Sequence, residues 1–155
     1  MDDTTKAVID RVTINYDTPR EITGGDSVTT FYDCRLLTPN DLARLAAEAV
    51  GHLGDGTFDL VLGMAYSGIL FSAAVASNQQ VAIFQKDNVI SGPSVQGRRV
   101  LIVDDVIHTG HHMQAAAQAV QKAGGSVVGY CCVIDRSPGV FHPGDKPIWS
   151  AYQIG

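Results

Sequence analysis

The chain has 155 residues, of which 45% are hydrophobic and 17% charged, and these values fit one globular domain over residues 1–155 with a sizeable core. Its formal net charge of −5, with no run of basic residues, argues against a nucleic-acid partner. No apolar stretch approaches the ~18 residues of a membrane span, and the acidic, polar start Met1–Lys6 is unlike a signal peptide, so no membrane partner is expected.

Residues 1–30 show little periodic pattern, and the segment from Pro19 to Gly25 indicates turns or a small, partial hood rather than core. The core is then expected to span residues 31–155. A helix is predicted over residues 38–53, because a threonine cap, a proline and an acid precede apolar residues at helical spacing. Glycines directly after this segment end the helix.

From residue 58 onward, strand-like and helix-like segments alternate. The strands are expected at 58–62, 81–84, 100–103 and 127–134, the helices at 69–77 and 113–123, and a loop at 86–98. This alternation predicts an α/β fold with a doubly wound, mostly parallel sheet and helices on both faces. Ligands bind such sheets beyond the carboxyl ends of the strands, so the loops at 63–68, 104–112 and 135–139 should converge on one binding face.

Two adjacent acids, Asp104 and Asp105, follow the apolar strand at residues 100–103 and precede a tight turn and a helix. Their carboxylates can accept hydrogen bonds from sugar hydroxyls or hold Mg²⁺, and the helix N-terminus offers free N–H groups to a phosphate. This combination fits a ligand that is both a sugar and a phosphate. Two alternatives remain open: acids that only stabilise the helix dipole in a solvated loop, and a site that binds Mg²⁺ alone.

Histidines, cysteines and glycine-rich motifs give weaker signals. His108, His111 and His112 lie beside the acid pair and allow a transition-metal site as an alternative to partly solvated residues on the first helical turn. The three cysteines form neither a disulfide framework nor a Cys-x₂-Cys spacing, so we expect buried thiols in a reducing cytoplasm. No Gly-x-Gly-x-x-Gly follows a strand and no Gly-Lys-Ser/Thr occurs, which argues against dinucleotide and P-loop folds.

The segment Val100–His112 resembles the 5-phosphoribosyl-1-pyrophosphate (PRPP) motif of type I phosphoribosyltransferases, in which an apolar run precedes two acids and a turn containing Thr-Gly. The resemblance implies that Asp104 and Asp105 hold the ribose hydroxyls and Mg²⁺ and take part in catalysis. It also implies that the backbone from His108 to His112 holds the 5-phosphate. The residues implied to bind PRPP in this segment are Asp104, Asp105, Val106, Ile107, His108, Thr109, Gly110, His111 and His112.

Three further segments, in the same order along the chain, resemble the orotate branch of this family. Phe31–Arg35 is similar to the segment that lines the base, Gly63–Ile69 to the pyrophosphate loop, and Ile134–Arg136 to an Asp-Arg pair after a strand. The residues implied to bind PRPP through the pyrophosphate loop are Ala65, Tyr66, Ser67 and Gly68, and those implied to bind the base are Phe31, Tyr32 and Arg136. Taken singly, the tyrosines fit core aromatics equally well, and the arginine fits a surface cation.

By this resemblance the chain is a Mg²⁺-dependent, homodimeric enzyme that joins a small, orotate-like base to PRPP and releases pyrophosphate. The family carries a basic mobile loop that closes over the site. Here Gln85–Asp87 runs directly into Asn88–Gly92, so the basic part is deleted and Lys86 is the remaining candidate for a catalytic cation. This deletion keeps open the alternative of a non-catalytic subunit that binds PRPP or a nucleotide for regulation or as a partner.

Other positions also depart from the family pattern. Ser67 stands where orotate enzymes often carry a lysine, and the phosphate turn ends in His111 and His112 instead of small or hydroxyl residues. Imidazoles there would strengthen phosphate binding as cations at lower pH. Asp26 lies where a lysine near the orotate carboxylate is common, which leaves the accepted base open. A last helix after Trp149 is expected to be short or absent.

Overall fold

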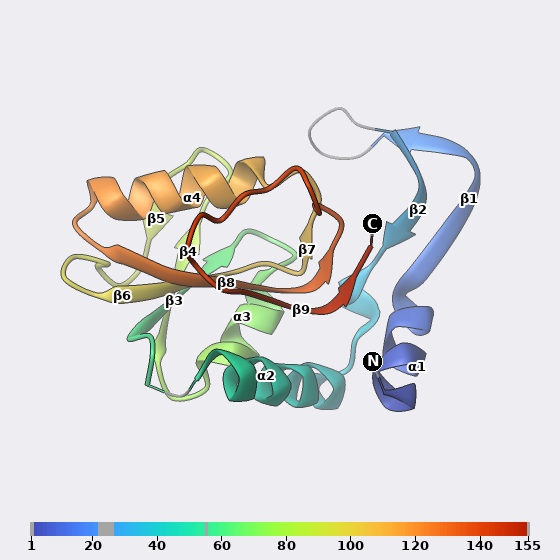
Figure 1. Cartoon of the computed structure of the whole chain (residues 1–155), viewed down its shortest axis with the longest axis horizontal. Helices are drawn as coiled ribbons and strands as arrows, with labels where there is room; N and C mark the ends of the chain where they lie inside the picture. Colours follow the sequence, from blue (N-terminus) through green and yellow to red (C-terminus); the bar gives the residue numbers. More distant parts are fainter. Residues whose placement is uncertain (1, 22–26, 55, 155) are drawn as a thin grey trace.

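The computed structural model describes residues 2–21, 27–54 and 56–154, which form a central sheet between two layers of helices (Figure 1). The helices are α1 (Asp3–Val12), α2 (Pro39–Leu53), α3 (Ile69–Ala76) and α4 (His111–Lys122), with a 3-10 turn η1 (Cys34–Leu36). The strands are β1 (Thr13–Glu21), β2 (Ser27–Tyr32), β3 (Leu60–Met64), β4 (Gln80–Phe84), β5 (Ile90–Ser91), β6 (Arg99–Val103), β7 (Val106–Ile107), β8 (Ser126–Asp135) and β9 (Ile148–Gln153). Within the described residues, no helix is long and apolar enough to cross a membrane.

The main sheet has seven strands and is mostly parallel, as the alternation of segments predicts. Its spatial order is β5-β4-β3-β6-β8, β7 pairs with β8 beyond the end of β6, and β9 also pairs with β8. Every pairing is parallel except that of β5 with β4. The sequence does not predict β5, β7 or β9, because the first two have two residues each and β9 is half-buried without a period-two pattern.

Each face of the sheet carries its own hydrophobic cluster, so the doubly wound expectation is confirmed. Successive strand residues point to opposite faces. Accordingly, Val61 packs with the cluster that includes α2 and α3, whereas Leu60 and Leu62 pack with the cluster that includes α4. In Figure 1, α4 lies on one side of the sheet and α2 and α3 lie on the other. Burial on both faces explains why the central strands are continuous apolar runs.

The predicted start of α2 is confirmed in its details. Thr38 Oγ1 accepts a hydrogen bond from the Asp41 N–H at 3.1 Å, and Asp41 Oδ2 accepts one from the Thr38 N–H at 2.9 Å. Strand β3, by contrast, begins and ends two residues later than predicted, because Gly63 and Met64 continue the strand instead of turning. A Cβ on Gly63 would lie 2.8 Å from the Ser72 side chain, so this glycine lets α3 pack closely on the sheet.

The expectation that residues 1–30 lie outside the core is wrong for α1. Val8, Ile9 and Val12 are buried in the same cluster as α2 and α3. A ten-residue helix with three buried apolar residues has too short a pattern to stand out in the sequence. β1 and β2 form a separate antiparallel sheet at the same end of the molecule (Figure 1). Residues 22–26, including Asp26, lie outside the described residues.

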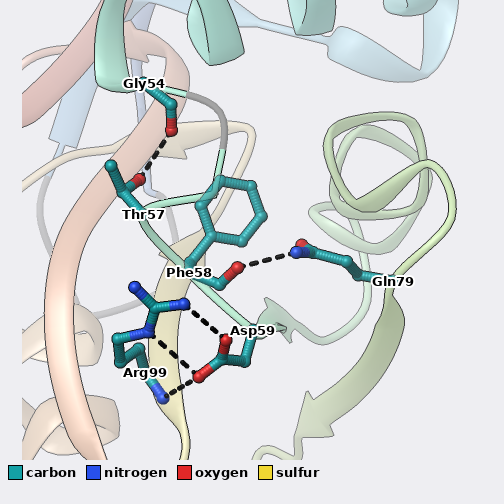
Figure 2. A network of polar contacts seen from close by, with 6 residues as sticks. All are labelled: Gly54, Thr57, Phe58, Asp59, Gln79 and Arg99. Atoms are coloured by element: carbon teal, nitrogen blue, oxygen red, sulfur yellow. Dashed lines mark hydrogen bonds and ion pairs between the residues drawn. The ribbon is translucent and has the colours of Figure 1, made fainter.

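Polar contacts hold the amino ends of β3 and β6 together (Figure 2). Arg99 donates from its backbone N–H and Nε to Asp59 Oδ2 at 3.0 and 3.1 Å, and from Nη2 to Oδ1 at 2.7 Å. These hydrogen bonds lower the pKa of Asp59 to about 2. Nearby, Gln79 Nε2 donates to the Phe58 carbonyl oxygen at 2.6 Å. Asp59 and Arg99 at this end of the sheet therefore form an ion pair with each other.

Candidate active site

The loops that carry the predicted site residues begin on one edge of the sheet. β3, β4, β6 and β8 are parallel, and the ends of the first three lie in register: Met64 pairs with Phe84, and Gly63 pairs with Val103. β8 pairs with the end of β6 at Cys131 and continues to Asp135 beside β7. The segments that follow these strands therefore emerge side by side. This confirms the expected convergence at the carboxyl edge, which is where ligands bind in sheets of this kind.

The backbone of the acid pair, Asp104 and Asp105, continues the pairing of β6 with β8. The Asp104 N–H donates to the Cys131 carbonyl at 3.0 Å, and the Asp105 carbonyl accepts from Val133 and Ile134 at 2.9 and 3.0 Å. Each carboxylate is oriented by the next backbone N–H, because Asp105 N donates to Asp104 Oδ1 and Val106 N donates to Asp105 Oδ1, both at 2.8 Å. The pair is thus fixed by the sheet rather than carried on a free loop.

The electrostatics of the acid pair are unfavourable without a ligand. Asp105 is buried, and burial together with the neighbouring negative charge of Asp105 raises the pKa of Asp104 well above its usual range. Across residues 2–21, 27–54 and 56–154, no lysine or arginine forms an ion pair with either carboxylate. A divalent cation or several hydroxyl donors would relieve this repulsion, as is common at binding sites.

The donor set fits Mg²⁺ bound together with a substrate. Mg²⁺ in proteins often takes one or two carboxylates and completes its shell with water and phosphate oxygens, and Asp104 and Asp105 supply two adjacent carboxylates. In the part of the chain that the structure describes, no group of three or more His, Cys, Asp or Glu side chains comes together as a metal site. The histidine-containing transition-metal alternative therefore gains no support from the geometry.

The loop at residues 65–68, directly after β3, packs onto the acid pair. Ser67 Oγ donates to Asp105 Oδ1 at 3.2 Å. Gly68 lies so close to Asp104 that a Cβ would be 2.6 Å from its Oδ1. Ser72 Oγ, buried in α3, donates to the Gly68 carbonyl at 2.6 Å and to that of Val103 at 3.3 Å. The 65–68 loop and the acid pair therefore form one unit, in which Gly68 is required for the close approach.

The turn at residues 108–112 leads into α4 without a side-chain cap. Gly110 has φ of 85°, and a Cβ there would lie 2.4 Å from the Cβ of Phe141. Thr109 Oγ1 accepts from the His111 N–H at a long 3.4 Å, and both His111 and His112 are exposed on the first helical turn. Uncapped N–H groups and the helix dipole together favour an anion at this position.

Arg136 and Tyr32 meet at the side of the site that faces β2. The Arg136 guanidinium lies 5.3 Å from the centre of the Tyr32 ring, and Nη1 donates to the Thr30 carbonyl at 2.7 Å. The Arg136 N–H donates to the carbonyl of Ile107, two residues after the acid pair, at 2.7 Å. Phe31 precedes Tyr32 in the strand and so projects from the opposite face. The structure thus brings two of the three predicted base residues into contact.

The segment predicted to lack the basic mobile loop is a tight hairpin between β4 and β5. The Gln85 N–H donates to the Val89 carbonyl at 2.8 Å, and the Asn88 N–H donates to the Gln85 carbonyl at 3.0 Å. Lys86 lies in this turn, with Nζ 5.2 Å from the centre of the Tyr66 ring. Tyr66 itself is 67% exposed. The hairpin therefore places its one cation against the 65–68 loop.

Sequence reasoning missed three groups that shape the site: the Ser72 hydroxyl, the Phe141 ring and the Thr30 carbonyl. Ser72 is the single hydroxyl residue inside the apolar segment Ile69–Ala76, and this contrast is a usable signal. Phe141 and Thr30 contact residues 31 and 106 positions away in the sequence, respectively, and no local pattern marks such contacts. Their roles depend on the completed fold.

Comparison with known proteins agrees with this geometry. The family model described as "Phosphoribosyl transferase domain" matches residues 77–149. The orotate phosphoribosyltransferase of Nocardioides sp. is 35% identical over 130 residues, which cover 77% of this chain and 72% of the relative. That of Pelotomaculum thermopropionicum is 34% identical over 128 residues, covering 76% of this chain and 67% of the relative.

Solved structures share the fold. The orotate phosphoribosyltransferase of Mycobacterium tuberculosis in complex with PRPP has a TM-score of 0.69 and 24% identity, covering 79% of this chain and 80% of that chain. Leishmania donovani UMP synthase has a TM-score of 0.79 and 22% identity, covering 97% of this chain and 35% of that chain. These similarities support the mostly parallel α/β architecture described above.

Proposed function

Because the chain belongs to the type I phosphoribosyltransferase family and resembles its orotate branch, we propose that it transfers the phosphoribosyl group of PRPP to a small, orotate-like base. In this reaction a base nitrogen forms a bond to C1 of the ribose, the bond from C1 to the pyrophosphate oxygen breaks, and pyrophosphate leaves with both bonding electrons. The observation that carries the proposal is the packing of the 65–68 loop on the acid pair, through Ser67 and Gly68.

The proposed roles follow from the position of each group. Asp104 and Asp105 accept hydrogen bonds from the ribose hydroxyls and would hold Mg²⁺. When bound, the positive Mg²⁺ ion would offset the negative charge of the phosphates. The 108–112 turn binds the 5-phosphate through backbone N–H groups at the start of α4. The 65–68 loop, with Lys86 beside it, binds the pyrophosphate. These phosphate-binding groups are held in position before the reaction begins, so that they can stabilise the negative charge of the phosphates.

The base is proposed to bind beside Arg136 and Tyr32. Arg136 is fixed at both ends, by its backbone hydrogen bond to Ile107 and by its guanidinium contact with Thr30. A fixed guanidinium near an aromatic ring suits a flat, acidic ring such as orotate. Phe31, on the opposite face of β2, is proposed to contribute to the base side only by shaping this strand.

A second candidate function is a non-catalytic subunit that binds PRPP or a nucleotide. The tight hairpin at Gln85–Val89 favours it, because this turn carries Lys86 and no further cation. Loss of one preorganised group that stabilises a leaving charge can lower a rate by about 10²–10³. We further propose that residues 1–155 act as one domain. As the family resemblance implies, this domain is proposed to form a homodimer in the cytoplasm. Light scattering coupled to size-exclusion chromatography would measure the mass of the protein in solution and so test the dimer.

The decisive assay mixes the protein with PRPP and Mg²⁺ and follows pyrophosphate release with and without orotate. Orotate-dependent release supports the transferase, and the Asp104→Asn/Asp105→Asn double variant should abolish it. Calorimetric binding of PRPP without any release would support the non-catalytic candidate instead. If PRPP does not bind the wild-type protein at all, the transferase proposal is wrong, and if no nucleotide binds either, both candidates are wrong. The control is Asp59→Asn, an acid at the far end of the same strands, which should leave release unchanged.

A further inference from the structure

A hollow open to solvent lies between the 65–68 loop, the β4–β5 hairpin and the start of α4. Its lining includes Ala65, Gln85, Lys86 and His112. The hollow therefore lies between three segments, each of which follows a different strand. Two of its walls carry a side chain that can hold a positive charge: Lys86 on the hairpin and His112 on α4.

The position of His112 differs from that of its neighbours in the 108–112 turn. His112 is an exposed residue on the first turn of α4, and it lines the same hollow as Gln85 and Lys86 of the hairpin. The helix N-terminus adds partial positive charge to the same wall. Lys86 is held against the 65–68 loop by its contact with the Tyr66 ring, 5.2 Å from Nζ to the ring centre. The acid in this hairpin, Asp87, has its Oδ1 in a hydrogen bond with the Val89 N–H at 3.3 Å.

We propose that His112 binds the pyrophosphate group of PRPP together with Lys86, which lines the same hollow, and so provides a contact that the shortened hairpin lacks. The inference rests on the proposed function, and it assigns His112 a ligand group different from the 5-phosphate held by the backbone of the same turn. Two donors from two different segments that line one hollow suit a ligand with two linked phosphates, whereas a single phosphate at the helix N-terminus needs only the N–H groups.

Calorimetry with three ligands, each with Mg²⁺, separates these roles: PRPP, inorganic pyrophosphate and ribose 5-phosphate. His112→Gln should weaken pyrophosphate and PRPP binding by about tenfold to a hundredfold, the range expected for one hydrogen bond to a charged group. Ribose 5-phosphate binding should change by less than about twofold, since the backbone N–H groups remain. His112→Arg keeps a cation on the same wall and should retain most pyrophosphate affinity.

The matched control is His142→Gln, which removes an exposed histidine from the loop after β8 and should leave all three affinities unchanged. An equal loss for ribose 5-phosphate and pyrophosphate in His112→Gln overturns the inference, because it assigns His112 to the 5-phosphate. Unchanged pyrophosphate binding in a well-folded His112→Gln also overturns it. Failure of the wild-type protein to bind PRPP instead rejects the proposed function itself, so the two failures are distinct.

Discussion

Each end of strand β6 lies beside an aspartate, Asp59 at the amino end and Asp104 at the carboxyl end, and the surroundings shift the pKa values of these two residues in opposite directions. At the amino end, Asp59 receives three hydrogen bonds from Arg99, which lower its pKa to about 2. At the carboxyl end, Asp104 lies beside Asp105, and burial and like charge raise its pKa. One end therefore uses its carboxylate to stabilise the fold, and the other keeps two carboxylates in a costly arrangement that a ligand can relieve.

This difference matches the general behaviour of parallel α/β sheets, in which ligands bind beyond the carboxyl ends of the strands. The two ends share the same strands, so a substitution at one end is a control for a substitution at the other. Substitutions at the carboxyl end should change the affinity for PRPP, whereas Asp59→Asn at the amino end should change the free energy of unfolding and leave that affinity unchanged.

The largest expected effect is on ligand binding by the double variant Asp104→Asn/Asp105→Asn. PRPP binding with Mg²⁺ should weaken by about 100-fold or more, because several hydrogen bonds to charged groups are lost. The folded double variant should be more stable than the wild-type protein at pH 7. Calorimetry measures the affinity, and urea unfolding measures the stability.

The pH dependence of this gain has a defined sign. The folded-state pKa of Asp104 is raised above 3.8, the ordinary value of an aspartate, so its contribution favours folding below pH 3.8 and is lost as the pH rises through the folded-state pKa. The advantage of the double variant over the wild type should therefore be clear at pH 7 and vanish near pH 3. A variant less stable than the wild type at pH 7 would contradict the proposed repulsion.

The next effect concerns the 108–112 turn. Gly110→Ala should lower the free energy of unfolding by about 2–5 kcal/mol, because a left-handed φ costs about 1–2 kcal/mol and crowding against Phe141 adds about 1–3 kcal/mol. Ribose 5-phosphate binding should weaken as well. Gly139→Ala is the matched control: Gly139 has φ of 81° with nothing within 4 Å of its Cβ position, so only the backbone cost applies. Equal losses in urea unfolding for both variants would rule out the Phe141 contact.

A smaller effect is expected for Ser67→Ala. The change removes the hydrogen bond from Ser67 to Asp105 while leaving the backbone of the 65–68 loop intact. A net hydrogen bond of about 0.5–1.5 kcal/mol corresponds to a loss of about twofold to tenfold in PRPP affinity. Ser126→Ala, an exposed serine at the amino end of β8, should not alter calorimetric binding. A loss of the same size in both variants would argue against coupling between the loop and the acid pair.

The parts of this molecule that the sequence predicts correctly are those with local causes. The capping box of α2 lies within four residues, and the order of apolar strand, acid pair and helix around Asp104 lies within one short segment. The convergence of the loops follows from the parallel sheet. Helix α1 and strand β9 were not predictable, because their apolar residues become a pattern only when packed against α2 and β8. The approach of Gly68 to Asp104 likewise exists only in three dimensions.

The smallest effect is expected at the amino end of β6, from Asp59→Asn. The folded-state pKa of Asp59 is about 2, below the ordinary aspartate value of 3.8, so its contribution to stability is fully present above pH 3.8 and is lost as the pH falls toward 2. Wild-type and variant stabilities should therefore differ slightly at pH 7, since the pair is exposed to solvent, and should converge near pH 2 in urea unfolding. PRPP affinity should be unchanged. If Asp59→Asn weakened PRPP binding, the two ends of β6 would be coupled, and the separation of a stabilising end from a binding end would be wrong.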